Sequence, residues 1–189
     1  VTYHPVTLEH FTAEEQCMNL LEALEEFSDY RIIFTLPNSD TNGRIIMRLI
    51  HEFVEKHKER SIAFTSLGKI SALFQSAGRG IRYLSALQYI SAVVGNSSSG
   101  IIEVPSFGIP TLNIGDRQKG RIAAESVIHC GTSKNEIMIG LLQILSEEMR
   151  GKMKLQSNPY EKQGTTEAIV RIIKNVSIEN LLQKSFYNL

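Results

Sequence analysis

Short apolar runs and longer amphipathic segments alternate along this chain. The short runs are rich in β-branched residues, as in buried strands, whereas the longer segments place apolar residues three or four positions apart, as in helices. The predicted strands are Val1–Tyr3, Arg31–Leu36, Ser61–Thr65, Ala92–Gly95, Thr111–Ile114 and Ser126–His129. The predicted helices are Thr12–Ser28, Gly43–Lys58, Tyr83–Ile90, one starting within Ser99–Phe107, Glu136–Met149 and one or two within Thr165–Leu189. This alternation implies right-handed crossovers, so we expect an α/β fold with a doubly wound, mostly parallel sheet.

The first predicted helix has a recognisable start. Thr12 is a candidate N-cap, and Glu15, three residues later, completes the sequence pattern of a capping box. Apolar residues then recur at helical spacing in this helix and in the next. They are Cys17, Leu20, Leu21, Leu24 and Phe27, followed by Ile46, Leu49, Ile50, Phe53 and Val54. We expect both stripes to face the core, and the helices of the tail to pack back across the domain.

Composition narrows the class of protein. The 189 residues are enough for one domain with a sizeable core, and 42% hydrophobic residues are ordinary for a globular protein. Lysine and arginine (20) equal aspartate and glutamate (20), so the charge does not favour nucleic-acid binding. No apolar run is long enough to span a membrane, and no signal peptide opens the chain.

The cysteines and the first residues add two expectations. Cys17 and Cys130 are too few for a disulfide framework and have no metal-ligand spacing. We therefore expect free thiols in a cytoplasmic protein that holds neither metal nor cofactor. The chain lacks an initiator methionine and begins with residues typical of a strand, so we expect it to be part of a longer polypeptide.

The most informative segment is 92–103, in which an apolar run ends at glycine and is followed by three serines and a second glycine. A strand passes into a helix in this way at the carboxyl end of an open α/β sheet, where ligands bind. The N–H groups that open a helix have no partner inside it and favour an anion. Ser97, Ser98 and Ser99 add hydroxyl donors, whereas Glu103 suits neutral hydroxyls such as a ribose diol. The segment predicts a nucleotide or nucleotide-sugar site, although serine and glycine also cap helices without a ligand.

Further loops that follow predicted strands bring polar residues to the same edge of the sheet. They are His4-Pro5, Pro37–Asp40, Thr65–Gly68 and Gly115–Arg121. The last loop holds Arg117 and Lys119 between two glycines and Arg121 directly after the second, and guanidinium groups are natural clamps for a diphosphate. Charged loops are more often simply solvated, so the argument for a site depends on these loops acting together.

Taken in order, these loops resemble the carboxyl-terminal half of the hydrolysing UDP-N-acetylglucosamine 2-epimerases, which make N-acetylmannosamine for sialic-acid-type sugars. The matching segments are Thr2–Thr7, Pro37–Asp40, Gly95–Gly100 with Glu103, Pro105–Pro110 and Asn113–Arg121. The resemblance implies a Rossmann-like fold, the C-terminal half of a two-domain glycosyltransferase-B-like architecture. Residues 1–189 would form the UDP-binding domain, with C-terminal helices in 161–189, and the amino-terminal domain would be absent.

The resemblance also implies roles for residues at matching positions. His4 would lie beside the diphosphate, on the leaving-group side. Ser97 and Ser98 would hold phosphate oxygens, and Arg117 would reach the UDP group. On the nucleoside, Glu103 would bond the ribose hydroxyls.

Two further contacts to the nucleotide follow from the same likeness. Asn38 would contact the nucleotide, and the backbone of Thr65–Gly68 would read the base. The implied reaction removes the proton at C2 of the sugar while UDP leaves C1, after which water adds to the resulting glycal. In this family the acid and base carboxylates belong to the amino-terminal domain, so we expect the chain alone to be inactive.

Residues 69–80 depart from the family pattern as an apparent insertion beside the base-reading loop. An extra helical turn, a lid, a partner surface and an artefact of the gene are the alternatives. For the whole chain, the alternatives are a non-hydrolysing epimerase or a glycosyltransferase domain of the same fold, or a non-catalytic interaction module. The expected partners are UDP-N-acetylglucosamine or UDP, the missing amino-terminal domain and a second copy in a homodimer, with no nucleic acid or membrane.

Overall fold

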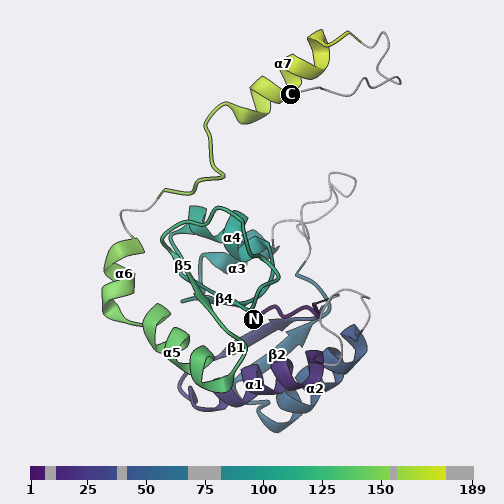
Figure 1. Cartoon of the computed structure of the whole chain (residues 1–189), viewed down its shortest axis with the longest axis vertical. Coiled ribbons are helices and arrows are strands. Elements are labelled where there is room, and N and C mark those ends of the chain that lie inside the picture. Colours follow the sequence, from purple (N-terminus) through teal and green to yellow (C-terminus); the bar gives the residue numbers. More distant parts are fainter. Residues whose placement is uncertain (7–11, 38–41, 68–81, 154–156, 178–189) are drawn as a thin grey trace.

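The computed structural model of the chain describes residues 1–6, 12–37, 42–67, 82–153 and 157–177. Its strands are β1 (Ile32–Thr35), β2 (Ser61–Phe64), β3 (Val93–Gly95), β4 (Thr111–Ile114) and β5 (Val127–Cys130). Its helices are α1 (Ala13–Glu25), α2 (Gly43–Lys56), α3 (Arg82–Leu87), α4 (Ser99–Ile102), the 3-10 helix η1 (Val104–Phe107), α5 (Lys134–Ile144), α6 (Glu147–Met153) and α7 (Thr165–Asn175). Strands and helices alternate along the chain as the hydrophobic pattern predicts (Figure 1).

The described strands form one parallel arrangement in two groups. β1 pairs with β2, and β4 lies between β3 and β5. The segment Val1–Tyr3 joins the groups, because Thr2 makes one parallel bridge to Thr35 and another to Gly95. The order across the sheet is therefore β2, β1, Val1–Tyr3, β3, β4, β5. This confirms the predicted α/β fold with a mostly parallel sheet.

Helices cover both faces of the sheet, as a doubly wound fold requires. On one face α1 packs against α2 and α5, around a core that includes Leu20, Ile46 and Ile137. On the other face α3, α4 and η1 surround a smaller cluster that includes Leu87 and Val104. Figure 1 shows α1 and α2 on the opposite side of the strands from α3 and α4. The predicted inward stripes of α1 and α2 are buried, except that their last positions are half-buried.

The predicted capping box at the start of α1 is wrong. Thr12 is the N-cap, but its backbone is already helical (φ −97°, ψ −12°) and its hydroxyl makes no capping bond. The hydroxyl instead accepts a hydrogen bond from Gln16 Nε2 at 3.2 Å. A capping box forms at α5, where Ser133 has an extended backbone (ψ 149°) and exchanges bonds with Glu136. The extended backbone is what directs an N-cap side chain back onto the helix.

The predicted helix Glu136–Met149 is two helices, because the chain turns at Ser146 between α5 and α6. The Ser146 hydroxyl donates to Gln143 O at 2.8 Å and accepts from the Met149 N–H at 3.1 Å. It thus satisfies a carbonyl at the end of α5 and an N–H at the start of α6. Serine competes with the helical backbone in this way, which a hydrophobic stripe does not reveal.

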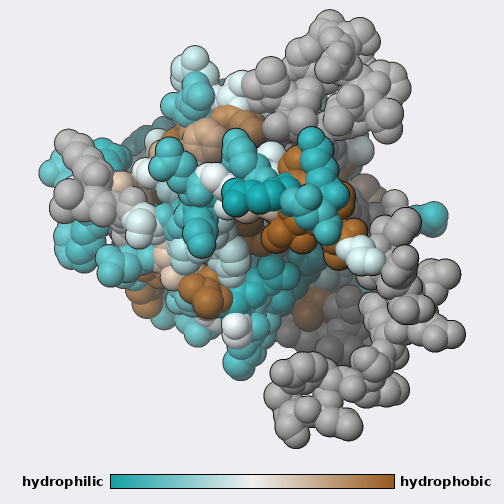
Figure 2. Space-filling view, turned by 90° about the horizontal axis from the view of Figure 1, so that it is seen from above, coloured by the Kyte–Doolittle hydropathy of each residue, from teal (hydrophilic) through white to brown (hydrophobic). Residues whose placement is uncertain are grey.

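α7 is helical, as predicted, but it does not pack back across the domain. None of its residues is buried, and Ile172 and Ile173 are 66% and 67% exposed. Figure 1 shows α7 apart from the body of the molecule. Seen from the α7 side, hydrophobic side chains lie open on the surface beside hydrophilic ones (Figure 2). The apolar stripe of α7 predicts that the helix packs against other residues, but no described residue covers it.

The remaining predictions concern the cysteines, the membrane and the insertion. Cys17 and Cys130 are free thiols, and burial raises the pKa of each to about 12. Within the described ranges, no helix has the length and apolar character needed to cross a membrane. The apparent insertion at 69–80 lies outside the described residues.

Candidate functional site

Asn96, which directly follows β3, holds together two loops at the carboxyl edge of the sheet. Its side-chain Oδ1 accepts the His4 N–H at 2.7 Å, and its Nδ2 donates to the His4 carbonyl at 2.8 Å. The amide therefore pairs with the backbone of the neighbouring segment as another strand would. Asn96 is 0% exposed and His4 only 7% exposed. The position of His4 is thus fixed relative to the loop after β3.

The same asparagine joins a third loop. Its backbone carbonyl accepts Arg117 Nη1 at 3.0 Å and Gln118 Nε2 at 2.9 Å, both from the loop after β4. Gln118 is buried, whereas Arg117 as a residue is exposed. A guanidinium has five N–H donors, so this anchor leaves donors of Arg117 available to a ligand. Three loops that are distant in sequence therefore meet at Asn96.

Gly95 makes this meeting possible. Its φ is +134°, and a Cβ atom built on it would lie 1.9 Å from the Thr2 carbonyl oxygen. The backbones meet this closely because Thr2 N donates to Val94 O at 3.0 Å and Asn96 N donates to Thr2 O at 3.1 Å. Only glycine combines this backbone conformation with this close approach.

The serines after Asn96 present donors at the same edge. Ser98 is the N-cap of α4, and no side-chain capping bond is made there. Among the described residues, no partner is found for the N–H groups of Ser97 and Ser98 or for the Ser98 hydroxyl. Ser97 Oγ accepts a long bond from the Ser99 N–H, at 3.4 Å. Two backbone donors and one hydroxyl are therefore available to an anion.

Ser99 faces a different group. Its hydroxyl donates to Glu103 Oε2 at 2.5 Å and is also hydrogen-bonded to the hydroxyl of Tyr83, on α3. Since the one proton of Ser99 is given to Glu103, the Tyr83 hydroxyl donates to Ser99. Burial raises the pKa of Tyr83, and the Glu103 carboxylate adds to that shift. The Ser99 hydroxyl is therefore already bonded to Glu103 and Tyr83, whereas the N–H groups of Ser97 and Ser98 have no partner among the described residues.

The side chains of the other two predicted cations, Arg121 and Lys119, make no hydrogen bond to Asn96 among the described residues. Arg121 is exposed, and no side-chain partner for it is found in the described part of the chain. Lys119 pairs with Asp116 at 2.9 Å, and this hydrogen bond raises the pKa of the ammonium. Asn38 and Gly68 lie outside the described residues.

Sequence reasoning did not single out Asn96, Gln118 or Tyr83. Asn96 was visible only as one letter between a glycine and three serines, and Gln118 as a polar residue among cations. Gln118 Oε1 is buried and has no partner among the described residues. No group of three or more His, Cys, Asp or Glu side chains able to hold a metal ion occurs in the described ranges.

Comparisons with known proteins identify the family. A family model described as UDP-N-acetylglucosamine 2-epimerase matches residues 1–174. The polysialic acid biosynthesis protein P7 of Escherichia coli is 37% identical over 191 residues, covering 100% of this chain and 46% of that protein. The GDP/UDP-N,N'-diacetylbacillosamine 2-epimerase (hydrolyzing) of Campylobacter jejuni is 32% identical, with the same coverage of 100% and 46%. The chain thus spans about half the length of the curated relatives it matches.

A solved structure supports the same fold. The structure of the S. aureus protein MnaA with UDP aligns with a TM-score of 0.64 at 17% identity, covering 92% of this chain and 43% of that one. At this level of identity the match concerns the fold alone.

Proposed function

Because the chain belongs to the UDP-N-acetylglucosamine 2-epimerase family, we propose that residues 1–189 form the UDP-holding domain of a hydrolysing member. The reaction would convert UDP-N-acetylglucosamine and water into N-acetylmannosamine and UDP. The observation that carries the proposal is the meeting of three strand-following loops at Asn96, with free donors from the serines and Arg117 beside it.

The diphosphate would be held by Ser97, Ser98 and Arg117. When UDP leaves C1 of the sugar, negative charge develops on the diphosphate oxygens. Preorganised N–H donors and a guanidinium stabilise such charge without reorganising, which lowers the barrier to departure. Asn96 positions these donors, because its amide fixes one loop and its carbonyl fixes the other. His4, held by the same amide, would lie on the leaving-group side of the diphosphate.

Glu103 would accept the ribose hydroxyls. One of its oxygens accepts the Ser99 hydroxyl, and the carboxylate retains further acceptor capacity for a diol. Tyr83 and Ser99 would hold it in place and so act as positioning residues. Asn38 and Arg121, and the backbone at Thr65–Gly68, remain candidates for further contacts to the nucleotide.

The chemistry on the sugar would need the other domain. Removal of the C2 proton and addition of water require acid and base groups, which family resemblance assigns to the amino-terminal domain. The chain alone would therefore bind UDP without turning over substrate. The hydrolysing type is supported by the printed name of the C. jejuni relative. A cytoplasmic location and a homodimer remain part of this proposal.

Calorimetric titration with UDP tests the site. We expect Arg117→Ala to weaken UDP binding at least about tenfold, since a charge-assisted hydrogen bond to phosphate is lost. Ser98→Ala should weaken it less. Lys119→Ala is the matched control, because Lys119 lies in the same loop but is paired with Asp116. Absence of UDP binding to the unsubstituted chain at millimolar concentration would overturn the proposal.

Product analysis of the complete enzyme tests the reaction type. A hydrolysing enzyme releases free N-acetylmannosamine and UDP, whereas a non-hydrolysing epimerase keeps the sugar attached to UDP. A sugar that stays attached to the nucleotide would rule out the hydrolysing assignment while leaving the UDP site intact.

A further inference from the structure

Tyr83, Ser99 and Glu103 form one hydrogen-bonded chain that links α3 to the proposed ribose contact. Ser99 Oγ donates to Glu103 Oε2 at 2.5 Å, and the Tyr83 hydroxyl is hydrogen-bonded to the same Ser99 oxygen. A serine hydroxyl has a single proton, so Tyr83 is the donor in the second bond. Both protons of the chain therefore point toward Glu103.

The direction of this chain leaves the Glu103 side chain as an acceptor only. A carboxylate has about four lone-pair sites, and Ser99 uses one of them. Among the described residues, no other side chain is found to pair with Glu103. A group that binds the remaining sites must bring its own protons, as a vicinal diol does and an ionised phosphate does not.

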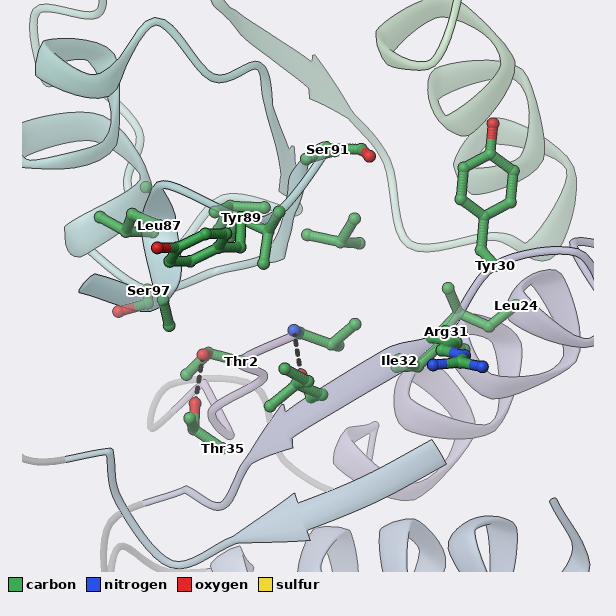
Figure 3. Close-up of a pocket in the computed structure, with 18 of the residues that line it drawn as sticks. Thr2, Leu24, Tyr30, Arg31, Ile32, Thr35, Leu87, Tyr89, Ser91 and Ser97 are labelled. Atoms are coloured by element: carbon green, nitrogen blue, oxygen red, sulfur yellow. Dashed lines mark hydrogen bonds between the residues drawn. The ribbon is translucent and has the colours of Figure 1, made fainter. Parts of the chain in front are cut away.

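The Tyr83 ring is held by packing, so its hydroxyl has a fixed position. The ring packs against the buried side chains of Leu87 and Val104. It also lines a mostly apolar cavity of about 360 Å³, in which Figure 3 shows Leu87 and Ser97 across from Leu24. Burial raises the pKa of the Tyr83 hydroxyl, which therefore keeps its proton and donates at neutral pH.

The helix that carries the other two members of the chain is fixed on the sheet. A Cβ built on Gly100 would lie 2.7 Å from Thr111 Cγ2, and the Thr111 hydroxyl donates to Gly100 O at 2.8 Å. Ser99 and Glu103 are four positions apart and so share one side of this helical turn. With the ring and the turn both held, Tyr83 fixes the Ser99 hydroxyl, and Ser99 fixes the carboxylate.

We propose that Tyr83 is the positioning residue that sets the sugar specificity of the site. Acting through Ser99, it aims Glu103 at a vicinal diol, so that ribonucleotides are selected over 2′-deoxyribonucleotides. The inference rests on the proposed function, because it takes Glu103 as the ribose contact. Donation from Tyr83 polarises the Ser99 hydroxyl and strengthens its bond to the carboxylate. A carboxylate held in this way accepts two hydroxyl groups at once, and loss of the 2′-hydroxyl removes one charge-assisted bond.

Calorimetric titrations with UDP and 2′-deoxy-UDP test the proposal through the ratio of the two dissociation constants. We expect the unsubstituted chain to bind UDP at least about tenfold more tightly than 2′-deoxy-UDP, since one charge-assisted hydrogen bond separates the ligands. Tyr83→Phe should reduce this ratio to about threefold by weakening UDP binding alone. Ser99→Ala should reduce the ratio at least as far. Adding Tyr83→Phe to Ser99→Ala should change nothing more, because the tyrosine acts through the serine.

Tyr160→Phe is the matched control. It also removes a tyrosine hydroxyl that donates a hydrogen bond, in this case to Ile122 O at 2.8 Å, but this bond is not part of the chain to Glu103. The ratio of the two dissociation constants should be unchanged in this variant. Thermal unfolding of every variant reports any loss of stability separately from ligand discrimination.

Equal weakening of UDP and 2′-deoxy-UDP binding by Tyr83→Phe would overturn the inference, because a merely structural role affects both ligands alike. If Tyr83→Phe does not fold, Ser99→Ala decides, and an unchanged ratio in that variant would overturn the inference as well. An unsubstituted chain that binds both ligands equally would do the same while leaving the proposed diphosphate contacts intact. If the unsubstituted chain binds neither ligand, the proposed function itself fails, and the inference fails with it.

Discussion

The two ends of the segment Val1–His4 lie in opposite chemical surroundings. At His4 the backbone meets a fully buried asparagine, and Arg117 and Gln118 complete a polar network. At Val1, three residues earlier in the same segment, the neighbouring cavity is lined mostly by apolar side chains. The comparison teaches that one short segment passes from mostly apolar to polar surroundings, and that the proposed UDP contacts gather at its polar end.

Gly95→Ala should have the largest effect, because Gly95 contacts the segment between its two ends. The new Cβ would overlap the Thr2 carbonyl oxygen at 1.9 Å, and φ is +134°. We expect urea unfolding to show a loss of more than about 3 kcal/mol, from strain and a broken bridge. Gly120→Ala is the control, since its φ is +82° but its Cβ would meet nothing within 4 Å. It should cost about 1 kcal/mol. Equal losses would show that the close contact at Gly95 is unimportant.

Asn96→Ala should come next and act at the polar end. It leaves the buried N–H and carbonyl of His4 without the side chain that pairs with them. The expected loss of unfolding free energy is about 3 kcal/mol, with weaker UDP binding in the fraction that folds. Asn135→Ala, at an exposed position of α5, should change stability by less than about 0.5 kcal/mol. A loss at Asn96 as small as at Asn135 would contradict the role of the amide in joining the loops.

Much of the polar end was predictable from sequence, but its centre was not. Serines after a strand and cations in a turn are local patterns, and the rule that strand-following loops share an edge brings Ser98 and Arg117 together. Asn96 acts across 92 positions on His4. That contact exists because Val1–Tyr3 lies beside β3, and strand order is not written in any local pattern.

Local patterns also failed where backbone geometry decides. Thr12 and Ser133 both precede glutamate by three residues, yet only Ser133 has the extended backbone that forms a capping box. The difference arises from how the chain enters each helix, which depends on tertiary packing. For α7, the apolar stripe predicted packing across the domain, and this was wrong, because none of the residues of α7 is buried against the described part of the chain.

The pH dependence of stability should report on the apolar end. The pKa of the Val1 amine is about 5 in the folded chain and 8.0 in the reference state, so between these values the unfolded chain binds more protons. Stability from this group therefore rises as pH increases from 5 to 8. We expect a gain of about 2 kcal/mol after allowing for partial exposure, measured by urea unfolding. Acetylation at Val1 should remove this rise, and an unchanged pH profile would place the amine in water.

Tyr83→Phe should have the smallest effect, because Tyr83 lies between the two surroundings. Its ring lines the mostly apolar cavity that also borders Val1. Its hydroxyl donates to Ser99, which in turn donates to Glu103. Phenylalanine keeps the ring and removes the hydroxyl, so the expected stability loss is only about 1 kcal/mol. If Ser99 positions Glu103 for a ribose, UDP binding should weaken about threefold, equivalent to less than about 1 kcal/mol. Tyr89→Phe, at a ring 87% exposed at the cavity, should change neither quantity. A stability loss at Tyr83 without any change in UDP binding would confine this residue to the apolar end and leave Glu103 without a positioning partner on α3.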